Sequence, residues 1–133
     1  MKQRIMAIND NQDILQMLQD VLTYEGYEFA GQREPEFAVD DLDRFKPDLI
    51  ILDWLFGREA RGMELLELMR LHPATSATPV LVCSAATNTV QEVEDSLRAK
   101  GIGVLYKPFQ LADLVGVIRG LLAGRPAPTA ESP

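Results

Sequence analysis

Cysteine is almost absent from this sequence, and long apolar runs are missing. Cys83 is the single cysteine among 133 residues, so a disulfide within the chain is excluded, which fits a reducing compartment. No apolar run approaches the roughly 20 residues of a membrane-spanning helix, and the first residues lack the apolar core of a signal peptide. We therefore expect a cytoplasmic protein that has no contact with a membrane.

Basic residues and histidine are also scarce. The chain has 13 Lys and Arg against 20 Asp and Glu, which gives a net charge of -7 and a pI near 4.6. Nucleic-acid phosphates are bound by clustered Lys and Arg, so we expect no nucleic-acid binding by this chain. The single histidine, His72, has no Cys or His companion and is predicted to be a surface residue. The length suits one domain with one core.

Short apolar runs alternate with longer amphipathic stretches along the chain. The predicted strands are Arg4–Ile8, Tyr27–Gly31, Leu49–Leu52, Val80–Cys83 and Val104–Tyr106, and the predicted helices are Asn11–Tyr24, Glu36–Phe45, Met63–Leu71, Val90–Ala99 and Leu111–Leu122. Strict alternation predicts a parallel sheet with helices on both faces. Residues 1–122 are expected to form the domain. Residues 123–133 carry three prolines and no apolar periodicity, and we expect a disordered tail or the start of a linker.

Polar residues stand where four of the predicted strands end: Asn9-Asp10, Asp53, Ser84 and Lys107. Ligands of open parallel sheets bind at the carboxyl ends of the strands, near the point where strand order reverses. If the strands are neighbours, these side chains share one crevice. Taken singly, each is better explained as a helix cap, a turn residue or a surface lysine. It is much harder to explain by chance that all of these residues fall at strand ends.

The side chains at these ends form a chemically coherent set. Asp10 and Asp53 supply the hard oxygen ligands that Mg²⁺ prefers, together with waters and phosphate oxygens. Lys107 supplies a positive charge for a phosphoryl oxygen, and Ser84 supplies a hydroxyl donor. A carboxylate accepts a phosphoryl group when a metal and a cation neutralise the developing charge. The set therefore indicates phosphoryl transfer to a carboxylate.

Four segments carry a resemblance to a known family: IMAINDN, LIILDWLF, VLVCSA and LYKPF, in this order. Together they resemble the response-regulator receiver domain, the CheY-like family of two-component signalling, over residues 4 to about 122. The resemblance implies a flavodoxin-like three-layer α/β sandwich with five helices and a parallel sheet of strand order 2-1-3-4-5. It also implies that Asp53 accepts a phosphoryl group from a histidine kinase or a histidine phosphotransfer protein.

The resemblance implies roles for other residues. Asp10, Asp53 and the backbone carbonyl of Leu55 match the ligands of Mg²⁺ (or Mn²⁺). Ser84 and Lys107 match the residues that contact the phosphoryl group.

The resemblance also implies a cis bond before Pro108. The face formed by residues 90–99, 104–106 and 111–122 is expected to change shape and bind an unknown downstream protein, with a homodimer through this face as an option. The chain is expected to act as a switch and not as a turnover enzyme.

The sequence departs from the family pattern in three places, which concern metal binding, the loop after Asp53 and the switch position. Asn9 replaces an acid that contacts the metal, often through water, which predicts weaker Mg²⁺ binding. The loop Phe56–Arg61 is one residue longer, with Gly62 one residue late. Its basic residues Arg58 and Arg61 are expected to be solvated, and the less favoured alternative is that one of them helps a partner or a phosphate to bind.

The third departure is at the switch position, where Val104 stands in place of an aromatic residue. Tyr106 shares a strand face with Val104 and either substitutes in part or packs in the adjoining surface, which is the favoured alternative. Apolar Leu55 and Ala86 predict slow loss of the phosphoryl group. The acidic residues Glu92, Glu94 and Asp95 are expected to form a solvated helix face.

Two alternatives stay open at this stage. The first is a degenerate receiver that binds proteins without phosphorylation, which Asn9 and the longer loop favour. The second is a phosphatase with Asp53 as nucleophile. Such enzymes need a second Asp two residues on, and Leu55 stands there, so this alternative is disfavoured.

Overall fold

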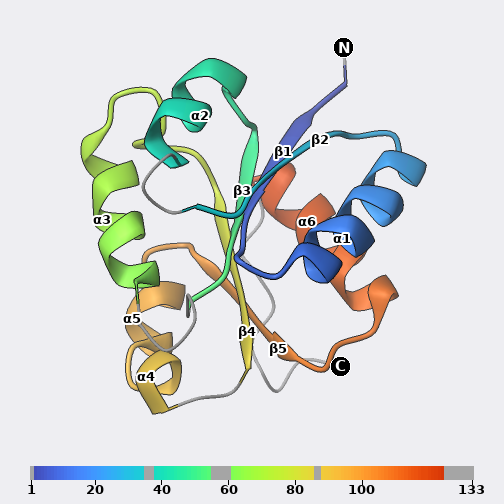
Figure 1. The fold of residues 1–133 in the computed structure, drawn as a ribbon. Helices are drawn as coiled ribbons and strands as arrows, with labels where there is room; N and C mark the ends of the chain where they lie inside the picture. Colours follow the sequence, from blue (N-terminus) through green and yellow to red (C-terminus); the bar gives the residue numbers. More distant parts are fainter. Residues whose placement is uncertain (1, 35–37, 55–60, 86–87, 125–133) are drawn as a thin grey trace.

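The computed structural model describes residues 2–34, 38–54, 61–85 and 88–124. The described residues form five strands and six helices; one helix follows each strand except β4, which two helices follow (Figure 1). In chain order they are β1 (Arg4–Ile8), α1 (Gln12–Tyr24), β2 (Glu28–Gln32), α2 (Ala38–Phe45), β3 (Leu49–Leu52), α3 (Gly62–Leu71), β4 (Val80–Ala85), α4 (Asn88–Gln91), α5 (Glu94–Ala99), β5 (Gly103–Lys107) and α6 (Leu111–Leu122).

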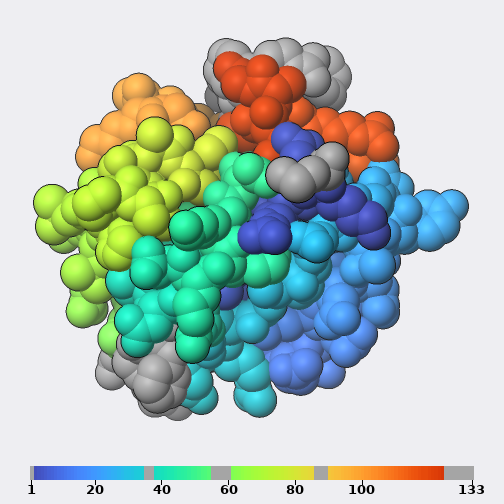
Figure 2. Space-filling model, turned by 90° about the horizontal axis from the view of Figure 1, so that it is seen from above, coloured from blue at the N-terminus to red at the C-terminus, as the bar shows by residue number. Residues whose placement is uncertain are grey.

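The strands form one parallel sheet of order β2-β1-β3-β4-β5, which confirms the predicted fold. Helices α1 and α6 cover one face of the sheet, and α2, α3, α4 and α5 cover the other (Figure 1). Figure 2 looks at the molecule from above, with α1 in blue and α6 in red on one side and α3 in yellow-green on the other. The sheet is therefore the middle layer of three.

Burial on both faces explains the continuous apolar runs of the central strands. All four residues of β3 are buried, and they divide alternately between two hydrophobic clusters. Ile50 and Leu52 face the cluster under α2–α5, whereas Leu49 and Ile51 face the cluster under α1 and α6. Successive strand residues point to opposite faces, so a strand between two helix layers has no polar side.

Helix α1 begins at an N-cap that Asn11 supplies. The Asn11 side chain accepts hydrogen bonds from the N–H groups of Asp13 and Ile14, at 2.9 Å and 3.2 Å. Asn11 thus takes the capping role, and Asp10, which precedes it, lies at the carboxyl end of β1. Leu15, Leu18 and Leu22 form the buried stripe of the helix.

The predicted helix 90–99 is wrong as a single element, because α4 and α5 are separate short helices. A turn at residues 92–93 divides them, with the Val93 N–H donating to the Val90 carbonyl at 3.2 Å. Val90 and Leu97 are both buried, and their spacing of seven residues fits one helix as well as two. Val93 is β-branched and lies at φ -110° and ψ 0°, where the regular helix is interrupted.

Strands β4 and β5 are longer than predicted. The ladder continues through the pairs Ser84–Tyr106 and Ala85–Lys107, so Ser84 and Lys107 lie within their strands. Their polar side chains end the apolar pattern but not the backbone pairing. The bond between Lys107 and Pro108 is cis, as the resemblance implies.

Candidate functional site

The candidate site lies at the carboxyl ends of the strands, which are toward the bottom of Figure 1. The chain leaves β1 to form β2 on one side, and β3 pairs with β1 on the other, so strand order reverses here. Ile8 pairs with Leu52, and the Asp53 N–H donates to the Ile8 carbonyl at 3.0 Å. Asp53 therefore lies beside Asn9 and Asp10, because these residues directly follow the paired ends of β3 and β1.

Three of the predicted residues line one small cavity. Asn9, Asp53 and Lys107 belong to the lining of a space of about 10 Å³, which Cys83 and mostly apolar residues complete: Ala7, Ile8, Ile14, Leu18, Ile51 and Phe109. Asp53 continues the face of Ile51, and Lys107 continues that of Leu105, so these side chains lie on the α1–α6 side. Strands β1, β3 and β5 thus bring an amide, a carboxylate and an ammonium group together.

The charges at this cavity act on the buried Cys83 thiol. Burial raises the pKa of Cys83 to about 12, with a lowering influence from Lys107 and a raising influence from Asp53. A thiol with so high a pKa is neutral at pH 7 and packs as a small apolar residue, as the sequence predicts.

Asn9 is held in a specific orientation. Its side chain is only 4% exposed, and its Oδ1 accepts the Asn11 N–H at 2.9 Å. A buried carboxylate at this place would be costly without a cation, whereas the amide is satisfied by the turn it supports. Asn9 therefore shapes the loop that presents Asp10.

Asp10 and Asp53 are partly exposed, so both carboxylates are accessible from solvent. Within the described residues, no group of three or more His, Cys, Asp or Glu side chains forms a cation site. Two carboxylates are nevertheless enough for Mg²⁺, which keeps several waters and binds phosphate oxygens as well. The donor set at this edge thus fits Mg²⁺ better than a cation that needs a complete protein cage.

Ser84 does not line the small cavity in the described part of the chain. It is 1% exposed and lies on the other face of the sheet, opposite Tyr106 in the β4–β5 ladder. The side chains of Ser84 and Asp53 therefore project toward opposite faces of the sheet.

The loop after β3 is closed by a contact that only glycine allows. The Gly62 N–H donates to the Trp54 carbonyl at 2.9 Å, and a Cβ on Gly62 would lie 2.8 Å from the Trp54 Cα. The glycine that stands one residue late in the sequence therefore anchors the loop. Arg61 forms an ion pair with Glu64 at 3.8 Å. The predictions for Leu55, Arg58 and Ala86 lie outside the described residues.

Tyr106 is packed, and its hydroxyl is bound. It lies against the cluster under α2–α5 and donates a hydrogen bond to Glu94 Oε1. Arg98 donates to Glu94 Oε2 at 2.8 Å and to the Val104 carbonyl at 2.9 Å. The prediction that Glu94 belongs to a solvated face is wrong, because its side chain is only 18% exposed. Val104 itself is buried.

Sequence reasoning also missed Arg33. Its Nε donates to the Asp10 carbonyl at 3.3 Å, from the segment that follows β2. The sequence offered a basis for predicting this position, because Arg33 follows β2, which is parallel to β1 and has its carboxyl end at the same edge of the sheet. Arg33 adds a basic group to the rim of the site.

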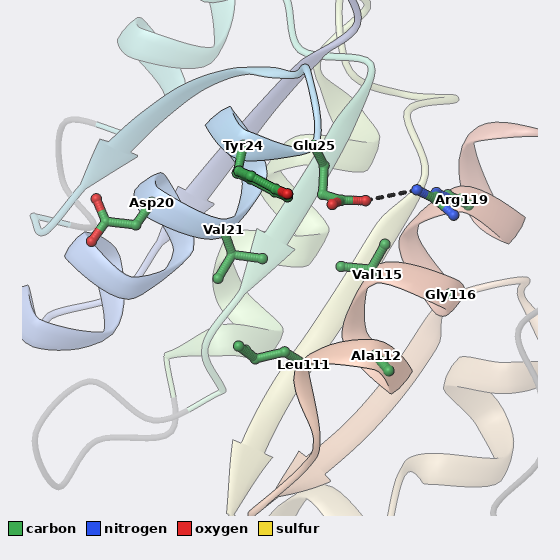
Figure 3. Close-up of a pocket in the computed structure, with 9 residues that line it drawn as sticks. All are labelled: Asp20, Val21, Tyr24, Glu25, Leu111, Ala112, Val115, Gly116 and Arg119. Carbon is green, nitrogen blue, oxygen red and sulfur yellow. Dashed lines mark hydrogen bonds and ion pairs between the residues drawn. The ribbon is translucent and has the colours of Figure 1, made fainter.

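A larger groove lies away from this edge, between α1 and α6 (Figure 3). It measures about 640 Å³, and Val21, Leu111 and Val115 form its apolar floor. Arg119 and Glu25 form an ion pair of 2.6 Å across one end (Figure 3). Asp10, Asp53 and Lys107 are not among its lining residues in the described chain, so it is separate from the candidate site.

Among the described residues, no helix combines the length and the apolar character of a membrane span. The chain matches the family model described as "Response regulator receiver domain" over residues 5–119.

Similar proteins are found among both curated sequences and solved structures. The DNA-binding response regulator MtrA of Mycobacterium tuberculosis is 30% identical over 122 residues, which is 92% of this chain and 51% of that protein. The phosphate regulon transcriptional regulatory protein PhoB of Klebsiella pneumoniae is 29% identical over 125 residues, with 92% and 52% covered. The chain spans about half the length of the curated relatives it matches.

Among solved structures, the chemotaxis protein CheY4 of Vibrio cholerae aligns with a TM-score of 0.79 and 25% identity, over 90% of this chain and 98% of that one. A response regulator from Desulfuromonas acetoxidans has a TM-score of 0.77 at 24% identity, covers 91% of this chain and 97% of its own, and supports the fold alone. The sheet order, the site at its edge and the match over residues 5–119 agree, and the chain belongs to the response-regulator receiver domains of two-component signalling.

Proposed function

We propose that this chain is a phosphoacceptor switch in which Asp53 is phosphorylated in a Mg²⁺-dependent reaction. The observation that carries the proposal is the meeting of Asn9, Asp53 and Lys107 around one cavity, with Asp10 on the adjoining loop. A carboxylate between a second carboxylate and an ammonium group is suited to hold a cation and a phosphoryl group at once.

The reaction transfers a phosphoryl group from a histidine of the donor protein. An Asp53 oxygen attacks phosphorus, the P–N bond to the imidazole breaks, and the leaving imidazole takes up a proton. Lys107 neutralises negative charge on a phosphoryl oxygen, and Ser84 donates a hydrogen bond to another once the end of β4 has moved.

Mg²⁺ (or Mn²⁺) would be held by Asp10, Asp53 and the Leu55 carbonyl, with Asn9 contributing through a water. The cation supplies charge neutralisation during the transfer. Water later removes the phosphoryl group, so the chain resets itself without turning over a substrate. This is a switch operated by a charged modification.

The phosphodonor is a histidine kinase or a histidine phosphotransfer protein, and the output is a second protein bound at the face of α4, α5, β5 and α6. A homodimer through this face is compatible with the same switch. Residues 1–122 form the receiver domain, and 123–133 are a tail or the start of a linker. We place the protein in the cytoplasm, where such donors act, and expect no nucleic-acid binding by this chain, given its net charge of -7.

Trp54 offers a direct test of the site. It follows Asp53 and is 2% exposed, so its fluorescence should report changes at the neighbouring carboxylate. We expect saturable fluorescence changes with Mg²⁺, and a further change with beryllofluoride, which mimics a phosphoryl group on a carboxylate. Asp53→Asn should abolish the second change.

A degenerate receiver is the second candidate function, and Asn9 favours it. The amide already accepts the Asn11 N–H, so part of its capacity to position a metal-bound water is in use. A wild-type chain that binds Mg²⁺ but no beryllofluoride would support this alternative.

A further inference from the structure

The end of strand β2 contacts the loop that carries Asp10. Two hydrogen bonds join them: the Asn9 N–H donates to the Gln32 carbonyl at 3.0 Å, and Arg33 Nε donates to the Asp10 carbonyl at 3.3 Å. The first bond extends the pairing of β1 with β2. The second brings a guanidinium group to the backbone of the residue whose carboxylate is expected to hold the cation.

Arg33 lies in a turn whose neighbours are anchored. The Gln32 side chain accepts the Glu34 N–H on Oε1 at 2.8 Å, which closes the turn around Arg33. Its Nε2 donates to Asp41 Oδ2 on helix α2, and the other oxygen of Asp41 accepts from Arg44. The backbone of Arg33 is therefore tied to α2 on one side and to β1 on the other, so its place at this edge is defined by the fold.

Arg33 changes the balance of charge at the candidate site. Asn9 is neutral where the family pattern has an acid, and Arg33 adds a positive charge beside Asp10. Among Asp10, Asp53, Lys107 and Arg33, two negative and two positive charges balance. An edge with this balance attracts Mg²⁺ less strongly, and an anionic phosphodonor more strongly, than one with an excess of acids.

We propose that Arg33 sets this balance in the phosphoacceptor site, so that its charge strengthens the encounter with an anionic phosphodonor and weakens the binding of Mg²⁺. This inference rests on the proposed function. With acetyl phosphate as the donor, an Asp53 oxygen attacks phosphorus, the bond from phosphorus to the acetyl oxygen breaks, and acetate leaves with the electron pair. Arg33 acts on the approach of the donor and not on the bond that forms.

A brace for the Asp10 loop is the alternative role of Arg33, and the two roles predict opposite changes in Mg²⁺ affinity. If Arg33 only held the loop through the Asp10 carbonyl, its removal would loosen the Asp10 carboxylate and weaken Mg²⁺ binding. If its charge matters, its removal strengthens Mg²⁺ binding. Arg33 is exposed, so its replacement leaves the core intact.

The first measurement is the Mg²⁺ affinity at low ionic strength, read from Trp54 fluorescence. Arg33→Gln should bind Mg²⁺ about threefold more tightly than the wild type, the scale of one unit charge acting on a divalent cation across several ångströms of water. The difference should shrink in about 1 M KCl, where screening is strong. Arg33→Lys keeps the charge and should return to the wild-type affinity. Equal or weaker binding in Arg33→Gln would overturn the proposal.

The second measurement is the rate of phosphorylation by acetyl phosphate, at a Mg²⁺ concentration that saturates each variant. Arg33→Gln should raise the KM for acetyl phosphate at least about threefold and leave the maximal rate unchanged, because only the encounter is affected. Arg33→Lys should restore the KM. An unchanged KM, or a loss that Arg33→Lys does not rescue, would overturn the proposal.

Arg119→Gln is the matched control. It changes the net charge by the same amount, at an exposed arginine of α6 that pairs with Glu25 in the separate groove. It should leave both quantities at the wild-type values, and effects equal to those of Arg33→Gln would overturn the proposal.

Failure of the proposed function gives a different result. A wild-type chain that binds Mg²⁺ but takes up no phosphoryl group would overturn the proposed function, and the Mg²⁺ titration would still confirm or refute the effect of the Arg33 charge on the cation. A wild-type chain that binds no Mg²⁺ would overturn both.

Discussion

Asn9 illustrates how much one residue changes at this site. Its amide supports the turn to Asn11 and keeps the buried position uncharged. In place of a carboxylate, the amide leaves one negative charge fewer beside Asp10 and Asp53 for binding a cation. The strand-end pattern of the sequence was sufficient to find Asn9, Asp53 and Lys107 together, because parallel strands end at one edge. It could not reveal the hydrogen bond of Asn9, which depends on the turn geometry.

Asn9→Asp should strengthen Mg²⁺ binding. An added carboxylate about 4 Å from the cation contributes on the order of 1 kcal/mol where water screens it, which is roughly a fivefold lower Kd. Titration of Trp54 fluorescence with Mg²⁺ measures the change, and equal affinities would refute the expectation. The variant should also lose stability when Mg²⁺ is absent, because three acids then share the edge.

Gly62→Ala should destabilise the fold. The added Cβ would lie 2.8 Å from the Trp54 Cα, and backbone cannot yield as a flexible side chain does. We expect a loss of about 1–3 kcal/mol in the free energy of unfolding, the usual range for overpacking, measured by urea denaturation.

Gly116→Ala is the control for this loss. Gly116 is an exposed residue of α6, and a Cβ there meets no atom within 4 Å. Alanine should stabilise that helix by about 0.5–1 kcal/mol. Equal effects of the two substitutions would mean that the contact with Trp54 does not govern the loop.

At the scale of helices and strands, apolar periodicity predicted the five strands well and one helix poorly. Both faces of the sheet are covered, so each strand appears in the sequence as a continuous apolar run. The break between α4 and α5 left no such trace, because Val90 and Leu97 are buried on either side of it. The hydrogen bonds of Glu94 with Arg98 and Tyr106 were also hidden, since these residues come from α5 and β5 and meet only in the fold.

The hydrogen bonds of Glu94 with Arg98 and Tyr106 should make the stability of the fold depend on pH. The pKa of Glu94 is lowered from 4.5 on folding, so its contribution is complete above about pH 4.5 and is lost as pH falls through the lower folded value. Glu94→Gln should therefore cost about 1 kcal/mol at pH 7, and the difference from wild type should shrink below pH 4.5. Urea denaturation at several pH values measures this, and a difference that persists undiminished in acid would contradict it.

At alkaline pH the dependence of stability on pH has the opposite sign: stability falls as pH rises. Folding raises the pKa of Tyr106 from 10 to about 12, so its contribution is complete below pH 10 and is lost as pH rises toward 12. Tyr106→Phe cannot titrate and should lose less stability than the wild type over this range. The same denaturation series measures it, and parallel losses in the two proteins would count against the bond.

For the whole molecule, the fold, the sheet order and the family were accessible from the sequence. Ordered motifs at strand ends carry information that no single residue holds, and this is why IMAINDN, LIILDWLF, VLVCSA and LYKPF together indicated a receiver domain. The partner and the output face were not accessible in the same way. They depend on surfaces whose residues are scattered along the chain.

The most direct test of phosphoryl transfer to Asp53 is intact-mass spectrometry after incubation with acetyl phosphate and Mg²⁺. We predict the addition of one phosphoryl group, its dependence on Mg²⁺, and its loss in Asp53→Asn. The modified peptide should contain Asp53. An unmodified wild-type chain, or an adduct that persists in Asp53→Asn, would contradict the assignment of Asp53 as the phosphoryl acceptor.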